Sequence, residues 1–185
     1  MTRMMHLVLG LLLASAIVFP ARAAVIDSGA NGFSVVENAH IGATPDAVYA
    51  ALITPSRWWS SSHTFSHDAS NLSLDATAGG CWCEKIPGQG SVQHLVVVYA
   101  LSGHSLVMRG ALGPLQELGV NGAMTIALKP AAGGTDLSLT YNVGGYLKNG
   151  LASWAGPVDG VLADQVLRLR SFVETGAAEP TTKSR

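Results

Sequence analysis

The longest regular hydrophobic pattern in the chain lies near its C-terminus, at residues 151–175. Apolar residues recur there every three or four positions, the spacing that places side chains on one face of an α-helix. The stripe consists of Trp154, Val158, Leu162, Val166, Leu169 and Val173. Gly176 follows it as a helix-ending glycine, while Arg168 and Arg170 fall off the stripe, near the negative end of the helix dipole. The pattern predicts one long helix.

Most of the chain before this helix alternates between apolar and polar residues, which is the period of a half-buried β-strand. Seven strands are predicted, at residues 33–42, 72–75, 81–86, 92–101, 106–112, 124–128 and 137–143. Segment 92–101 is apolar at consecutive positions, so we expect it to be covered on both faces. Glu37 breaks the apolar phase of the first strand. It either points into a cavity or, as we expect, marks an edge or a β-bulge.

Two breaks in these patterns indicate where helices begin. Thr44-Pro45-Asp46 is a helix start, with a capping threonine followed by proline at the first helical position. The short helix that follows ends at Pro55, and a further turn precedes the strands. Pro157 lies early in the long helix, where it either kinks the helix or marks its true start.

The order of elements is therefore one strand, two short helices, six antiparallel strands and a long helix. This predicts an α+β fold in which a seven-stranded antiparallel sheet grips the C-terminal helix. One helix rarely fills the concave face of such a sheet, so we expect a cavity between helix and sheet. Its mouth should lie near residues 58–65 and the loop at 113–119.

Residues 1–23 have the three parts of an export signal. Arg3 supplies the positive charge, Leu7–Phe19 is an apolar run, and Ala21-Arg22-Ala23 is a cleavage site of the small-x-small type. The run is too short to span a bilayer of about 30 Å comfortably, so we expect no stable membrane anchor. We predict a signal peptide at 1–23, one domain at 24–176, a disordered tail at 177–185, and a periplasmic or secreted protein.

Composition narrows the possible partners. Charged residues make up 12% of the chain and hydrophobic residues 48%. Removal of Arg3 and Arg22 reduces 11 basic residues to 9, against 12 acidic ones, for a net charge of −3. Because no basic stripe remains, we expect neither nucleic acid nor anionic membrane surfaces as partners. The abundant apolar material suits a large core or an apolar cavity.

Several short motifs, together with the order of elements, resemble the START-like or SRPBCC superfamily, whose fold is the helix-grip fold. They are Ile41–Tyr49, Trp58-Trp59, His63-Thr64-Phe65-Ser66, Gly79–Glu84, Leu112–Gln116 and Ala155–Gly160. Within the superfamily, the chain is similar to polyketide cyclase/dehydratase-like proteins and to homologues of the Hsp90 ATPase activator. The resemblance covers nearly all of the mature chain. It implies a cavity for lipids, polyketides or other hydrophobic molecules, and in some members a cyclase reaction.

The candidate site residues follow from strand and helix phase. We expect eight side chains to line the cavity: Trp59, His63, Trp82, Tyr99, Met108, Arg109, Tyr141 and Trp154. Arg109 could hold an anionic head group there. If the protein is an enzyme, the acid and base would come from His63, Glu84 or His94. No nucleophile elbow, phosphate-binding loop or paired-carboxylate motif is present in the sequence.

Three functions follow from these residues. The first is a carrier or sensor of a hydrophobic small molecule; the second is a cyclase- or dehydratase-type enzyme with a cavity His/Glu acid–base pair. The third is an interaction protein with a filled core. An enzyme should place its acid and base facing each other across the cavity, whereas a carrier needs only apolar walls. We predict no cofactor.

Cys81 and Cys83 are the only cysteines. On a regular strand they point to the same face, with Cα atoms about 6.6 Å apart, near the upper limit for a disulfide. They are buried thiols, or a disulfide relieved by a bulge, or ligands of a metal ion together with His63 and His67. We expect the thiols and predict no metal.

Overall fold

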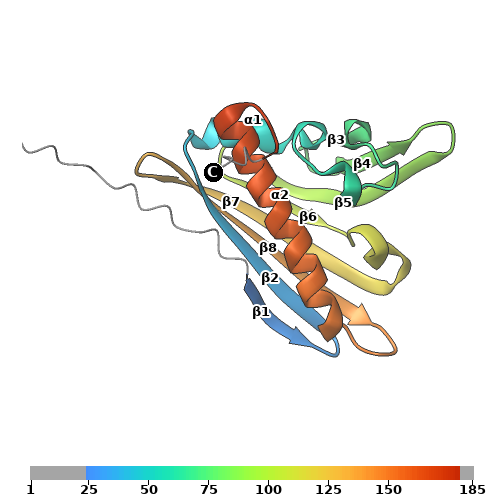
Figure 1. Ribbon diagram of the computed structural model, residues 1–185. Coiled ribbons are helices and arrows are strands. Elements are labelled where there is room, and N and C mark those ends of the chain that lie inside the picture. The colour runs from blue at the N-terminus through green and yellow to red at the C-terminus, as the bar shows by residue number, and fades with distance from the viewer. Residues whose placement is uncertain (1–23, 180–185) are drawn as a thin grey trace, which may run out of the picture.

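A long helix lies diagonally across one face of a curved antiparallel sheet (Figure 1). The computed structural model describes residues 24–179. The predicted signal peptide, 1–23, and the end of the predicted tail, 180–185, lie outside this range. The strands are β1 (Ala24–Gly29), β2 (Gly32–Ile41), β3 (Leu72–Leu74), β4 (Cys81–Ile86), β5 (Gly90–Leu101), β6 (Ser105–Arg109), β7 (Gly119–Ala131) and β8 (Gly134–Tyr146).

Two α-helices and five short 3₁₀ turns connect and cover these strands. They are α1 (Pro45–Leu52), η1 (Pro55–Arg57), η2 (Ser61–His63), η3 (Ala69–Asn71), η4 (Gly113–Glu117), η5 (Ala152–Trp154) and α2 (Ala155–Thr175). Thr44 caps α1 as expected, because its side chain accepts a hydrogen bond from the Ala47 amide. No helix within residues 24–179 combines the length and apolarity needed to cross a membrane.

The eight strands form one sheet in the order β1-β2-β8-β7-β6-β5-β4-β3, with every neighbouring pair antiparallel. The predicted α+β helix-grip architecture is confirmed, with one strand more than the seven expected. The additional strand is β1, part of which reads as a polar lead in the sequence. It lies at the edge of the sheet and exposes most of its side chains, so it carries no alternating apolar pattern.

Helix α2 packs mainly on β2 and turns the predicted apolar stripe toward the sheet. The middle of the stripe is buried, at Leu162, Val166 and Leu169. Gly176 ends the helix with φ 80°, and its N–H donates to the Phe172 carbonyl at 2.9 Å. A positive φ of this kind is the reason that glycine terminates many helices.

The start of α2 resolves the two alternatives for Pro157. The helix begins at Ala155, which places Pro157 in the first turn. Backbone N–H groups in the first turn have no acceptor within the helix, so proline removes no hydrogen bond there. Pro157 therefore marks the start of the helix rather than a kink.

Arg168 is more buried than its position off the apolar stripe predicts. Its side chain is 16% exposed, and its Nε donates to the Trp58 carbonyl at 3.0 Å. This bond ties α2 to the end of η1, so Arg168 belongs to the contact between the helix and the loop segment that precedes β3.

Strand β5 contains two β-bulges that change which side chains face the helix. Its pairing with β4 skips His94, and its pairing with β6 skips Val98. Each additional residue shifts the alternation by one position, so His94 and Leu95 are both buried. Val98 and Tyr99 are both exposed for the same reason. The expectation that 92–101 is covered on both faces is therefore wrong.

Glu37 is buried on the inner face of β2. It is 1% exposed, and the pairing of β2 with β8 is continuous through it, so the expected bulge is absent and the side chain faces inward. Burial first, and then the charge of the neighbouring Asp159 on α2, raise the pKa of Glu37 to about 8. Among the described residues, Glu37 Oε1 and Asp159 Oδ1 have no hydrogen-bond partner. The pair therefore holds a proton near neutral pH.

Two leucines near the C-terminal end of α2 test the assignment of its buried face. Leu169 is 2% exposed and Leu167 is 41% exposed. Leu169→Ala should lower the free energy of unfolding by about 2–5 kcal/mol, because it leaves a cavity in the core. The matched Leu167→Ala should cost less than about 1 kcal/mol. Urea unfolding measures both, and equal losses would contradict the assignment.

The carboxyl pair makes stability depend on pH. Between the ordinary pKa of 4.5 and the folded-state value of about 8, the folded protein binds more protons at Glu37 than the unfolded chain does. The contribution of the pair is therefore complete below 4.5 and is lost as the pH rises toward 8. Glu37→Gln should remove at least about 1 kcal/mol of this loss, since one pKa unit corresponds to about 1.4 kcal/mol.

Urea unfolding across this pH range measures the effect. Glu117→Gln is the control, because Glu117 is an exposed glutamate to which the same substitution can be made. An unchanged pH dependence in Glu37→Gln would show that Glu37 ionises normally.

Candidate functional site

A cavity of about 440 Å³ lies between α2 and the end of the sheet formed by β4 and β5. Its walls are mainly apolar. The lining residues are Trp59, Ser62, His63, Thr64, Phe65, Leu72, Trp82, His94, Leu112, Gly113, Pro114, Leu115, Trp154, Pro157, Val158, Val161 and Leu162. Most come from the two segments where the sequence predicts the mouth of a cavity and from one side of α2, whereas Leu72, Trp82 and His94 come from β3, β4 and β5.

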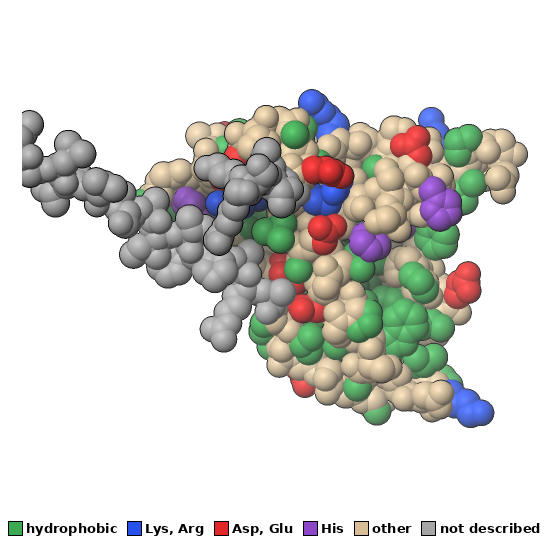
Figure 2. Space-filling model, viewed as in Figure 1, with side chains coloured by type: hydrophobic (Ala, Val, Ile, Leu, Met, Phe, Trp, Pro, Cys, Tyr) green, Lys and Arg blue, Asp and Glu red, His purple; other side chains and the backbone are tan. Residues whose placement is uncertain are grey.

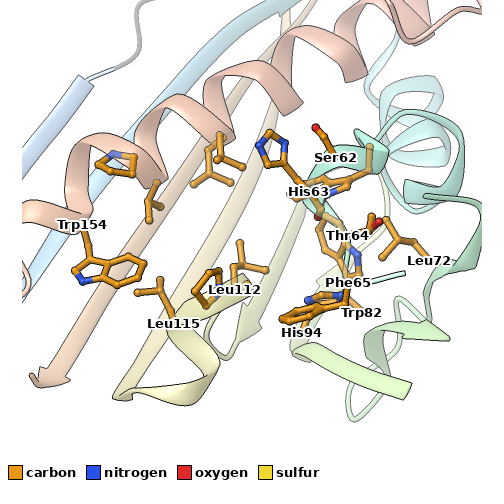
Figure 3. Close-up of a pocket in the computed structure, with 17 residues that line it drawn as sticks. Ser62, His63, Thr64, Phe65, Leu72, Trp82, His94, Leu112, Leu115 and Trp154 are labelled. Carbon is orange, nitrogen blue, oxygen red and sulfur yellow. Dashed lines mark hydrogen bonds between the residues drawn. The ribbon is translucent and has the colours of Figure 1, made fainter. Parts of the chain in front are cut away.

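The two ends of the cavity differ in character. Trp154 and Leu115 lie at one end, whereas His63, Phe65 and His94 lie at the other, near β4 (Figure 3). On the molecular surface, hydrophobic side chains gather between the start of α2 and the η4 turn (Figure 2). The cavity therefore has an apolar end and an end that carries histidines.

Three tryptophans form the packed wall beside the histidines. The ring centroids of Trp59 and Trp82 are 4.9 Å apart, and Trp58 contacts both rings edge-on. Aromatic rings prefer such edge-to-face contacts because the positive ring edge meets the negative ring face. Trp59 Nε1 also donates to the His63 carbonyl at 2.9 Å, which holds the η2 turn against the cluster.

Glu84 and His94 form a buried pair at the histidine end. Glu84 is fully buried and His94 is 7% exposed, and the carboxylate and His94 Nε2 are 3.0 Å apart. Glu84 also accepts hydrogen bonds from the backbone amides of Phe65 and Ser66. The β5 bulge at His94 makes this contact possible, because regular alternation from Leu95 would turn the imidazole to the outer face.

The surroundings of the pair determine its protonation. Burial opposes ionisation of Glu84, but hydrogen bonds from Ser66, Phe65 and His94 outweigh it and lower the pKa of the carboxyl. Burial also lowers the pKa of His94, although the charge of Glu84 partly offsets that effect. A neutral imidazole beside a carboxylate donates through Nε2, which leaves Nδ1 as a hydrogen-bond acceptor. Gln116 Nε2 lies 3.4 Å from that nitrogen.

His63 is held by a different element. Gln165 of α2 is 1% exposed and accepts a hydrogen bond from the Ser60 amide through Oε1. Its Nε2 therefore faces His63 Nδ1, at 3.2 Å. Gln165 was not among the predicted site residues. Gln165 lies between Leu162 and Leu169 on the buried face of the helix. A polar residue at a position where the pattern predicts an apolar one is the sequence signal that could have identified it.

The predicted acid and base candidates do not face one another as a pair across the cavity. Glu84 and His94 are bonded to each other on adjacent strands, and Glu84 does not line the cavity. His63 lines it from the η2 turn. The arrangement provides one acceptor nitrogen, on His94, backed by a carboxylate.

Of the ten predicted site residues, five line the cavity, Glu84 contacts one of these five, and four need a correction. Trp59, His63, Trp82, His94 and Trp154 line it. Tyr99 is 49% exposed and Arg109 is also exposed, both on the outer face of the sheet. The bulge at Val98 moves Tyr99 outward, and Arg109 alternates with the inward-facing Met108.

Met108 and Tyr141 are fully buried in the core and do not line the cavity. The Tyr141 hydroxyl donates to the Gly110 carbonyl at 3.0 Å and accepts from the Leu112 amide at 3.1 Å. Burial raises the pKa of Tyr141 to about 12. Tyr141 therefore supports the η4 side of the cavity from beneath instead of meeting its contents.

Cys81 and Cys83 form a disulfide, with Cα atoms 5.4 Å apart. The expectation of two free thiols is wrong. The strand is locally shorter than the regular geometry assumed for it, which brings the two cysteines within bonding range. Because both sulfurs are bonded to each other, the alternative of a site with two cysteine thiolates and two histidines does not arise. Within the described residues, no group of three or more potential metal ligands gathers.

Comparison with known proteins places this geometry in a family. Residues 32–174 match the family model described as "Polyketide cyclase / dehydrase and lipid transport". None of the curated proteins compared with the chain matches it. The comparison with solved structures, in contrast, found 127 matching chains.

Two solved structures illustrate the similarity. CalU16 from Micromonospora echinospora aligns with a TM-score of 0.57 and 15% identity, covering 88% of each chain. The Aha1 dimer from Colwellia psychrerythraea aligns with a TM-score of 0.55 and 17% identity, covering 77% of this chain and 97% of that one. At these identities the likeness establishes the fold.

Replacement of Glu84 tests the buried pair. Glu84→Gln should lower the free energy of unfolding by about 1–3 kcal/mol. The carboxylate now accepts hydrogen bonds on both oxygens, whereas the NH₂ group of glutamine would face an N–H donor and leave it without an acceptor. The carboxylate contributes stability above the ordinary pKa of 4.5 that is lost as the pH falls, and the variant should lack this loss. Urea unfolding measures both effects. A loss no larger than that of Glu117→Gln would contradict the role of Glu84.

Proposed function

Because this chain belongs to the polyketide cyclase/dehydrase and lipid transport family, we propose that it binds a hydrophobic small molecule, such as a lipid, a polyketide or an aromatic compound. The observation that carries the proposal is the cavity of about 440 Å³ between α2 and the sheet. A largely preformed, apolar cavity with a few polar groups is the usual form of a small-molecule site. The His94 imidazole supplies one such polar group.

The cavity walls suggest how a ligand would be held. Leu115, Trp154 and Val158 would pack against an apolar body, with the hydrophobic effect as the driving force. A hydroxyl group on the ligand could donate to His94 Nδ1 in place of the Gln116 amide, which lies 3.4 Å from that nitrogen. No charged side chain lines the cavity apart from any protonated histidine, so a neutral ligand fits the lining better than a strongly charged one.

The second candidate is an enzyme of the cyclase or dehydratase kind. Its specific support is the buried Glu84–His94 pair at the cavity wall. A neutral imidazole whose Nε2–H is bonded to a carboxylate can accept a proton at Nδ1 and is stabilised as the imidazolium by the carboxylate charge. His94 would be the base in such a reaction, and Glu84 would orient it.

We also propose that the protein is exported and acts in the periplasm or outside the cell. The support is the export-signal pattern of residues 1–23 in the sequence, and a disulfide that an oxidising compartment would maintain. N-terminal sequencing of the protein from the exporting cell should find Ala24 as the first residue. An intact Met1 in the soluble fraction would overturn this proposal.

A substitution that fills the cavity should prevent binding. Val161→Trp places a bulky ring at a half-buried position of the lining, so it should abolish binding of the neutral fluorescent probe N-phenyl-1-naphthylamine. Val98→Trp, on the exposed outer face, is the matched control and should bind the probe as the unmodified protein does. Fluorescence titration measures affinity, and circular dichroism checks folding. Normal binding by folded Val161→Trp would place the site elsewhere.

Mass spectrometry of the native protein purified from its own cell would identify a bound ligand. A co-purified apolar molecule supports the binding proposal, and extraction into solvent allows its structure to be determined. To separate carrier from enzyme, the extracted compound or its precursors are incubated with the protein and with His94→Gln. Turnover, such as loss of water, by the unmodified protein alone would indicate the enzyme. Binding without turnover by either would indicate the carrier.

A further inference from the structure

The disulfide and the cavity meet at the pairing of β4 with β5. Cys81 pairs with Val96 and Cys83 pairs with Gln93, so two residue steps on β4 face three on β5. The residue left over is His94, which turns inward and bonds to Glu84. The disulfide therefore spans the site directly opposite the bulge that brings the imidazole to the cavity.

The geometry of β4 matches this role. The Cα atoms of Cys81 and Cys83 are 5.4 Å apart, whereas two steps of regular strand cover about 6.6 Å. Shortening β4 at this point increases the mismatch with β5 and leaves the additional residue outside the ladder. Trp82, between the cysteines, remains buried in the cavity wall. The disulfide therefore constrains the strand at Trp82, between the two cysteines, and opposite His94, on the neighbouring strand.

General stabilisation of the chain does not account for such a bond. A disulfide restricts the unfolded chain more strongly as the loop that it closes grows longer. Cys81 and Cys83 are two residues apart, so the closed loop is nearly the smallest possible. Both cysteines are half-buried on the face of β4 opposite Trp82, where a soluble reductant can approach. The consequences of the bond are therefore local.

We propose that the Cys81–Cys83 disulfide is a redox modification site that controls the position of His94 at the cavity. In the disulfide form, the bulge holds the imidazole on Glu84. In the dithiol form, β4 can extend to regular strand length and pair Cys83 with His94, which would turn the imidazole toward the outer face. Cys81 and Cys83 are positioning residues in this scheme, and His94 is the group that they position.

The switching step is thiol–disulfide exchange with a dithiol reductant. One thiolate of the reductant attacks a cysteine sulfur, forming a mixed disulfide and releasing the other cysteine as a thiolate. The second thiol of the reductant then closes its own disulfide and releases the first cysteine. Two electrons pass to the protein, the two protons of the dithiol end on the cysteines, and the dithiol is oxidised to a disulfide.

The experiment compares the ¹⁵N-labelled chain before and after reduction with dithiothreitol, with Cys81→Ser/Cys83→Ser as a form that cannot be oxidised. Imidazole nitrogen NMR, assigned with His94→Gln, should show a hydrogen-bonded Nε2–H only in the disulfide form. The reduced chain and the double variant should both lose this signal. Both should bind N-phenyl-1-naphthylamine about tenfold more weakly, the factor that corresponds to one hydrogen bond of ordinary net strength.

Three results would overturn the proposal. Unchanged His94 nitrogen signals after reduction would show that the disulfide does not position the imidazole. Loss of the circular dichroism spectrum on reduction would show that the bond holds the whole fold and not one bulge. The double variant must also be insensitive to dithiothreitol; a response there would assign the effect to the reagent and overturn the proposal as well.

The inference rests on the proposed function for its binding measurement alone. Failure of the probe to bind either redox form would count against the proposed function. The imidazole signals would still decide, independently, whether the disulfide controls His94.

Discussion

A single helix has to cover one face of an eight-stranded sheet, and it is too narrow to do so. Eight strands spaced about 4.8 Å apart extend over roughly 34 Å, whereas a helix with its side chains is about 10 Å across. Helix α2 packs mainly on β2, so the β4 and β5 end of the sheet needs another cover. The loop segment from Trp58 to Phe65 and the η4 turn supply it. The cavity is the space that these three elements leave between them.

Two buried glutamates, Glu37 on β2 and Glu84 on β4, differ in their surroundings. On the β2 side, burial and the neighbouring Asp159 carboxylate disfavour the charged form of Glu37. On the cavity side, Glu84 keeps its charge because two backbone amides and an imidazole donate to it. Two glutamates with the same intrinsic chemistry therefore have pKa values shifted in opposite directions. Both side chains are nearly inaccessible to water, so the difference comes from their neighbours: hydrogen-bond donors surround Glu84, whereas a second carboxylate lies beside Glu37.

Family membership and fold establish that a cavity of this kind is expected, but they do not determine chemistry. The same scaffold serves different functions because function depends on the side chains that a cavity presents. In this protein those side chains are apolar at the η4 end and include His63 and His94 at the other. Without the one-residue bulge of β5, His94 would not face the cavity, and the cavity would lack the imidazole nitrogen. That irregularity lies directly opposite the Cys81–Cys83 disulfide, and this is the basis of the proposed redox control.

The sequence by itself determined the features that depend on local periodicity. The stripe on α2, the cap at Thr44, the glycine at the helix end and most of the strands are all short-range patterns of polarity and backbone preference. The helix-grip architecture follows from their order, because a sheet with one apolar face must be covered by the long helix. Trp59, Trp82 and Trp154 could be identified as cavity candidates in the same way, from their phase.

Only the tertiary structure decided what depends on pairing between strands. A bulge leaves no mark on the alternation until the partner strand is known, so Tyr99 and His94 could not be placed correctly by phase alone. Edge strand β1 carries no core-facing pattern, and Glu37 is in phase with the core although its charge argues for the surface. The partners of buried polar groups, Asp159 for Glu37 and His63 for Gln165, lie more than a hundred residues away in the sequence. Long-range contacts of this kind have no local signature in the sequence, because they form only when folding brings distant segments together.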